Sequence, residues 1–152
     1  MDKYNFHYCQ KIVVYSKDCS SVLLCKRKGE ADYDGVYSFI GGKMETTDGS
    51  IMEGLKREKD EEVGSEFKVK IFPTYSTNAF FVKKDGSRMV LPHYYAVHEE
   101  GEIKLNEEYS EYTWVPLVDI YMFEPKIPNI PEIITKLESL KQIQCDTDSV
   151  II

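Results

Sequence analysis

The segment from Gly41 to Gly64, GGKMETTDGSIMEGLKREKDEEVG, constrains the fold of this chain more than any other. It joins a pair of glycines to a helix with recognisable signals at both ends. Ser50 and Glu53 have the spacing of a capping box, in which a hydroxyl and a carboxylate accept hydrogen bonds from free backbone N–H groups. Gly64 follows the last apolar position, where glycine commonly ends a helix because it has no side chain. The sequence therefore predicts a tight glycine loop followed by a helix over 50–63.

Three carboxylates of this helix, from Glu58, Glu61 and Glu62, have i, i+3, i+4 spacing and so lie on one face. Such like charges repel each other by a few tenths of a kcal/mol per pair, about as much as an opposite pair gains. A shared cation is the simplest explanation, and oxygen ligands favour Mg²⁺ or Mn²⁺. Arg57 is spaced to hold one carboxylate in place, and the Gly42 backbone is free to approach the ion. A solvated, charge-rich helix face is the alternative for the acids taken alone.

These residues resemble the signature of the Nudix hydrolases, G-x5-E-x7-R-E-U-x-E-E-x-G-U, where U is a bulky aliphatic residue. The first half fits only with one extra residue, so the expected glutamate falls near Asp48, with Gly49 in the strict position. Lys59 and Ser65 replace two aliphatic positions. The second half matches without a gap, at Arg57, Glu58, Glu61, Glu62 and Gly64.

The flanking segments 20–45 and 107–120 also resemble the family, so that the resemblance covers most of residues 11–122. It implies an α/β/α sandwich with a mixed β-sheet, and metal-dependent hydrolysis of a nucleoside diphosphate linked to another moiety. In that chemistry Glu58, Glu61 and Glu62 would bind the metal with the Gly42 backbone nearby, and Arg57 would hold a carboxylate. Two hypotheses remain for the general base. It is Glu58 or an acid of segment 107–111, where Glu108 is best spaced and a solvated acidic loop is the alternative.

Substrate candidates come from the basic and aromatic residues near the glycine loop. Lysine and arginine side chains there would contact phosphates, and aromatic side chains would contact a base or sugar. His93 and Tyr95, two apart on a predicted strand, share a face. For all of these, a charged strand end, a sheet-surface role or a core role is the alternative. The candidates are Lys26, Arg27, Lys43, Tyr37, Phe39, His93 and Tyr95.

The preferred substrate is a nucleoside triphosphate or a related nucleotide, with release of a monophosphate. ADP-ribose, a nucleotide sugar and a dinucleoside polyphosphate are alternatives. The altered loop near Asp48 motivates a hypothesis of another class, a catalytically silent nucleotide-binding module. A calcium-binding surface helix is a third hypothesis.

Global properties are consistent with a small-molecule enzyme. The 152 residues suit a hydrolase domain over 1–144, with a flexible tail over 145–152 whose apolar end is free to dock. A formal charge of -7 without a basic stripe argues against nucleic acid polymers as partners. No apolar run reaches membrane-spanning length and no signal peptide is evident, so we expect a cytoplasmic protein without membrane contact. The four cysteines, which lack a C-x-x-C pair, are expected to be reduced thiols. A homodimer stays open, because dimers are common among similar proteins.

Periodicity predicts the remaining elements. Apolar residues at helical spacing predict a closing helix over 131–143. In the first helix, Lys59 is expected to lay its stem on the core while its ammonium reaches water. A hairpin turn is expected at 84–86. Strands are predicted over 10–16, 21–27, 66–72, 77–84, 87–97, 101–105 and 112–117.

Overall fold

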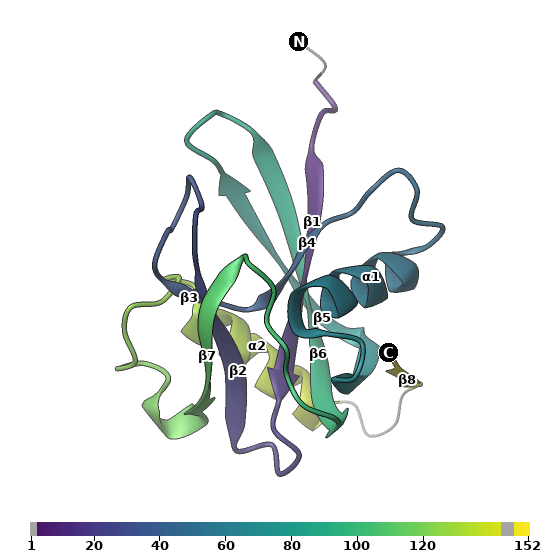
Figure 1. Ribbon diagram of the computed structural model, residues 1–152, viewed down its shortest axis with the longest axis vertical. Helices are drawn as coiled ribbons and strands as arrows, with labels where there is room; N and C mark the ends of the chain where they lie inside the picture. Colours follow the sequence, from purple (N-terminus) through teal and green to yellow (C-terminus); the bar gives the residue numbers. More distant parts are fainter. Residues whose placement is uncertain (1–2, 144–147) are drawn as a thin grey trace.

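The computed structural model describes residues 3–143 and 148–152. In this part of the chain an eight-stranded sheet lies between two helices (Figure 1). The strand order is β3-β2-β1-β6-β5-β8, with β4 paired to β1 and β7 paired to β2. The strands are β1 (His7–Tyr15), β2 (Ser21–Arg27), β3 (Tyr37–Ser38), β4 (Ile40–Lys43), β5 (Lys68–Val82), β6 (Arg88–Glu100), β7 (Tyr109–Pro116) and β8 (Val150–Ile151).

Strand β1 organises the sheet. It pairs antiparallel with β2 and β4, and parallel with β6, so the sheet is mixed as expected. Its residues from Cys9 to Tyr15 are all buried. This fits a strand covered on both faces, although Gln10 and Lys11 are polar exceptions among its buried residues.

The two helices cover opposite faces of the sheet: α1 (Ile51–Val63) packs on one core and α2 (Ile130–Ile143) on the other. Neighbouring residues of β1 divide between these cores, Ile12 with the α1 side and Val13 with the α2 side, because successive side chains of a strand point to opposite faces. The expected α/β/α sandwich is therefore confirmed. A short 3₁₀ helix, η1 (Leu117–Asp119), follows β7. Neither long helix within the described residues has the length and apolar character needed to cross a membrane.

Two strand predictions need correction. The segments 66–72 and 77–84, expected as separate strands, are largely merged in β5, whose pairing with β6 is irregular between Phe72 and Ser76. The turn at 84–86 does connect β5 to β6.

The segment 101–105 is not a strand, contrary to expectation. Its backbone follows the end of α1 instead, where the N–H of Lys104 donates to Val63 O over 2.9 Å. Just beyond it, the N–H of Asn106 donates to Glu62 O over 3.1 Å. Helix ends leave carbonyls without intrahelical partners, so these bonds compete successfully with sheet pairing.

Lys59 also differs from the expectation. Its side chain is fully buried, and its ammonium pairs with Asp60 instead of reaching water. Burial lowers the pKa of Lys59, and the hydrogen bond to Asp60 opposes this effect. The charged pair replaces the aliphatic side chain of the family signature at this position.

The C-terminal segment ends on the sheet edge. Residues 145–147 of the expected flexible tail lie outside the described part of the chain. Beyond them, β8 pairs with β5, and Ile152 and Val69 exchange two backbone hydrogen bonds of 2.9 and 3.0 Å. Ile152 is buried, so the apolar end docks on this molecule.

Candidate active site

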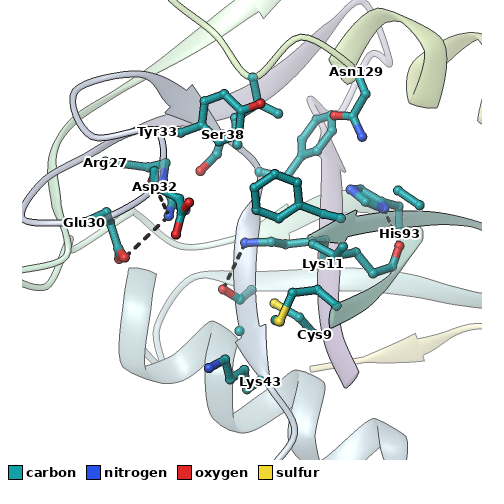
Figure 2. A pocket seen from close by; sticks show the side chains of 18 of the residues that line it. Cys9, Lys11, Arg27, Glu30, Asp32, Tyr33, Ser38, Lys43, His93 and Asn129 are labelled. Atoms are coloured by element: carbon teal, nitrogen blue, oxygen red, sulfur yellow. Dashed lines mark hydrogen bonds and ion pairs between the residues drawn. The ribbon is translucent and has the colours of Figure 1, made fainter. Parts of the chain in front are cut away.

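A cavity of about 660 Å³ opens beside β4 (Figure 2). Gly41 and Gly42, expected in a tight loop, belong to this strand instead and pair with β1. Its volume lies within the range of about 300–1,000 Å³ that is common for small-molecule sites. Carboxylates, cations and aromatic rings all line it. Those predicted from the sequence are Glu58, Glu62, Glu108, Gly42, Arg27, Lys43, Phe39 and His93.

The start of α1 fixes the loop that borders the cavity. Ser50 Oγ accepts a hydrogen bond from Glu53 N over 3.1 Å, as the capping box predicts. The Glu53 carboxylate accepts from Gly49 N over 2.7 Å, one residue before the N-cap residue that a capping box would use. The carboxylate therefore binds the loop as well as the helix.

Arg57 connects this loop to the acidic face of α1. Its Nε and Nη2 donate to the two Asp48 oxygens, each over 2.9 Å, in a bidentate pair. Its Nη1 lies 2.9 Å from Glu58, 2.6 Å from Glu45 and 3.4 Å from Glu61. The hydrogen bonds that Asp48 accepts from Arg57, together with one from the Glu45 backbone, lower the pKa of Asp48 to about 2. Asp48 thus supplies the loop carboxylate despite the extra residue, and the predicted Arg57 to Glu61 contact is the longest of these pairs.

Glu62 is the most buried of the three helix carboxylates, with 2% of its surface exposed. Its Oε1 accepts from Gly41 N over 2.8 Å and from Tyr109 Oη over 2.9 Å. Burial raises the pKa of Glu62 to about 8; the charge of Lys11 opposes this rise, and the nearby Glu108 carboxyl adds to it. The Glu62 carboxylate is therefore poised to take up a proton or a cation.

Glu58 lies against Gly42 of β4. A Cβ atom at Gly42 would overlap the Glu58 carboxylate and lie 2.6 Å from its Cδ, so only glycine leaves this carboxylate in place. Burial raises the pKa of Glu58, and the hydrogen bond from Arg57 opposes the rise. Glu58 and Glu62 are thus two buried carboxyls that both disfavour an uncompensated negative charge.

The donor chemistry of the cavity suits a hard cation. Of the six acidic residues in its lining, Glu30 and Asp32 contact Arg27. The other four, Glu45, Glu58, Glu62 and Glu108, supply the oxygen ligands that Mg²⁺ and Mn²⁺ prefer. Within residues 3–143 and 148–152, no three acidic, histidine or cysteine side chains stand close enough together to hold a metal ion. Glu61 is exposed and does not line the cavity. The ligand set of Glu58, Glu61 and Glu62 therefore stays a prediction.

Three substrate candidates lie outside the cavity. Lys26 faces Glu111 at 4.0 Å, and the Tyr37 hydroxyl donates to the same carboxylate. Tyr95 packs in the core beneath α2, where its ring lies 4.7 Å from that of Tyr15. These three side chains would bind a substrate only if it extended outside the cavity.

His93 is a buried, uncharged member of the cavity wall (Figure 2). Its Nδ1 donates to Leu91 O over 2.8 Å, and its ring meets Phe39 edge-on with centroids 5.8 Å apart. Burial lowers the pKa of His93 to about 4. At neutral pH the imidazole therefore keeps Nε2 as a hydrogen-bond acceptor.

Lys11 was not among the residues predicted from the sequence, yet it lines the cavity and is 8% exposed. Its Nζ donates to Gly41 O over 3.4 Å (Figure 2). The available signal was a charged residue inside the apolar strand 10–16. Buried lysines are rare unless their charge is compensated, so its place there indicates a use.

A pH dependence follows from Glu62. Because the folded state raises the pKa of Glu62 from 4.5 to about 8, it binds more protons than the unfolded state between these values. Stability of the metal-free protein should therefore fall as pH rises from about 4.5 to about 8. Urea unfolding in EDTA at pH 5, 6, 7 and 8 measures this slope, with Glu62→Gln as the matched variant. Equal slopes for the two proteins would contradict the assignment to Glu62.

Comparison with known proteins decides the family. The model of the NUDIX domain family matches residues 6–137. The chain belongs to the Nudix family. The resemblance drawn from the residues of α1 and its loop is therefore confirmed. No curated protein matches the chain significantly.

Solved structures of Nudix proteins share the fold at low sequence identity. A MutT protein from Methanosarcina mazei Go1 has a TM-score of 0.76 and 19% identity, with 93% of this chain and 99% of that chain covered. A C. elegans Ap4A hydrolase in a binary complex has a TM-score of 0.73 and 15% identity, covering 91% and 99%. The NUDIX domain of Shewanella oneidensis NrtR, complexed with ADP ribose, has a TM-score of 0.68 and 18% identity, covering 91% and 90%.

Proposed function

We propose that this Nudix protein is a divalent-metal-dependent nucleotide pyrophosphohydrolase, with nucleoside triphosphates as the first choice of substrate. One observation carries the proposal: buried Glu58 and Glu62 lie beside Gly41 and Gly42 of β4 and line a cavity of nucleotide size. Lys43, in the same lining, supplies positive charge for phosphate oxygens, and Arg27 adds to it from an ion pair with Glu30 at 3.4 Å.

The roles within the site follow from the contacts. Glu58 and Glu62 would hold the metal with Glu61 and the Gly42 backbone, and Mg²⁺ or Mn²⁺ would stabilise charge on the phosphate oxygens and acidify a bound water. Arg57 is 2.9 Å from Glu58 and keeps that carboxylate oriented.

Two candidates remain for the group that accepts the proton of the attacking water. Glu58 lies against Gly42, and Glu108 lies close enough to Glu62 to raise its pKa. Each lines the cavity, so each can reach a bound substrate.

Three other classes of substrate are alternatives. The fold-similar proteins include an Ap4A hydrolase and a domain complexed with ADP ribose. A dinucleoside polyphosphate, ADP-ribose and a nucleotide sugar all contain the phosphoric anhydride that this chemistry requires. A cytoplasmic location is kept as a further part of the proposal.

A hydrolysis panel tests the proposed function. Purified protein would be incubated with nucleoside triphosphates, ADP-ribose, nucleotide sugars and dinucleoside polyphosphates, with Mg²⁺, with Mn²⁺ and with EDTA. We expect metal-dependent release of a nucleoside monophosphate, and oxygen-18 water would show which phosphorus atom is attacked. Tight nucleotide binding without product across the panel would indicate the silent binding module instead.

A further inference from the structure

Lys11 lies between the two chemically different ends of the cavity. Within the sheet, its backbone pairs with Gly41 of β4 on one side and with His93 of β6 on the other. The carboxylates lie on the Gly41 side, where Gly41 N donates a hydrogen bond to Glu62. On the other side, the ring of His93 meets that of Phe39, with centroids 5.8 Å apart. A ligand that spans both ends passes over Lys11.

The Lys11 ammonium has little local compensation. Its hydrogen bond to Gly41 O is long, at 3.4 Å. In the described part of the chain, no carboxylate lies within the 4.0 Å of an ion pair with it. The charge of Lys11 lowers the pKa of Glu62, but the two groups are further apart than an ion pair. Burying a charge without a partner is costly, so an anionic ligand would relieve this arrangement.

We propose that Lys11 is a specificity-determining residue that binds the phosphate attached to the nucleoside. The inference rests on the proposed function only in taking a nucleotide as the ligand. The carboxylate end holds the anhydride, and the ring end holds the apolar part of the nucleotide. The phosphate that joins them then lies over Lys11, whose ammonium donates to its oxygens. Lys11 thereby selects nucleotides over nucleosides.

Binding of nucleoside monophosphates tests this role without turnover, because these ligands contain no anhydride. Equilibrium dialysis would compare AMP, GMP, CMP and UMP with the four corresponding nucleosides, in Mg²⁺ and in EDTA. We expect wild-type protein to bind at least one monophosphate more tightly than its nucleoside. Lys11→Met should weaken that binding by about tenfold to a hundredfold, the loss of a hydrogen bond to a charged group. Affinity for the nucleoside should stay within about twofold.

Matched variants separate this role from a structural one. Lys11→Arg keeps the charge and should retain most of the affinity for the monophosphate. Lys136→Met removes an exposed lysine of α2 and should change nothing. Lys11→Gln, a polar and uncharged replacement, gives the same measurement if the methionine variant fails to fold.

Three results would overturn the proposal. They are equal monophosphate affinity in Lys11→Met and wild type, an equal loss for monophosphate and nucleoside, and a wild-type protein that prefers no monophosphate over its nucleoside. Failure of the hydrolysis panel is a different outcome. Monophosphate binding that depends on Lys11, without product from any substrate, would leave the role of Lys11 intact and remove the enzyme.

Discussion

Glu58→Gln and Glu62→Gln are each expected to lower kcat/KM on the best panel substrate by about 10²–10⁴-fold. Each substitution keeps the size of the side chain and removes its negative charge. Both carboxyls are buried in the cavity lining, and burial raises the pKa of each. A cation bound there would lose one of its negatively charged ligands, because the amide of glutamine carries no charge. Steady-state kinetics with saturating Mg²⁺ or Mn²⁺ would measure the loss.

Glu66→Gln is the matched control, because this exposed glutamate beyond α1 does not line the cavity. Its activity should equal that of wild type, and thermal unfolding should show all variants folded. Activity near wild type in both Glu58→Gln and Glu62→Gln would exclude the proposed metal site.

Glu61→Gln addresses the exposed member of the predicted set. A loss comparable to that of the buried pair would include Glu61 among the ligands. A loss below about tenfold would assign it to the outer surface of α1, where its carboxylate lies 3.4 Å from Arg57.

Helix α1 could be predicted to within a residue because its signals are local. Ser50 and Gly64 mark its ends by backbone chemistry that acts within one turn, and the structure places the helix over Ile51–Val63. The pairing of Arg57 with Asp48 was beyond such reasoning. It depends on how a loop with one extra residue returns to the helix, and sequence spacing does not fix that path.

The face of a strand could be predicted, but not what covers it. His93 and Tyr95 do share a face of β6, since they pair with Lys11 and Val13 of β1. Helix α2 packs over Tyr95, whereas His93 lies further along the strand and lines the cavity. The extent of α2 along the sheet is a tertiary property that alternation in one strand does not contain. For the same reason, alternation within β1 does not show that Lys11 lies between Gly41 of β4 and His93 of β6.

Gly41→Ala is expected to destabilise the fold by about 3 kcal/mol or more. The φ angle of Gly41 is 131°, which side-chain-bearing residues rarely adopt. An added Cβ would overlap the Gln10 backbone oxygen and lie 2.8 Å from Lys11 Cα. These backbone atoms belong to the central strand and cannot move without disturbing the pairing of β1 with β4. Urea unfolding monitored by circular dichroism would measure the change in free energy.

Substitutions at two other glycines distinguish the cost of backbone strain from the cost of a steric contact. Gly29 has a φ of 77° with open space around it, so Gly29→Ala should cost only the backbone term of about 1–2 kcal/mol. Gly42→Ala meets the end of the flexible Glu58 side chain, which can turn away. That variant should stay folded and lose activity, because the displaced carboxylate no longer lies at the loop. Stability of Gly41→Ala equal to that of Gly29→Ala would show that β1 and β4 can separate. The close approach of Gly41 to β1 would then not be what holds β4, and with it Glu62, at the cavity.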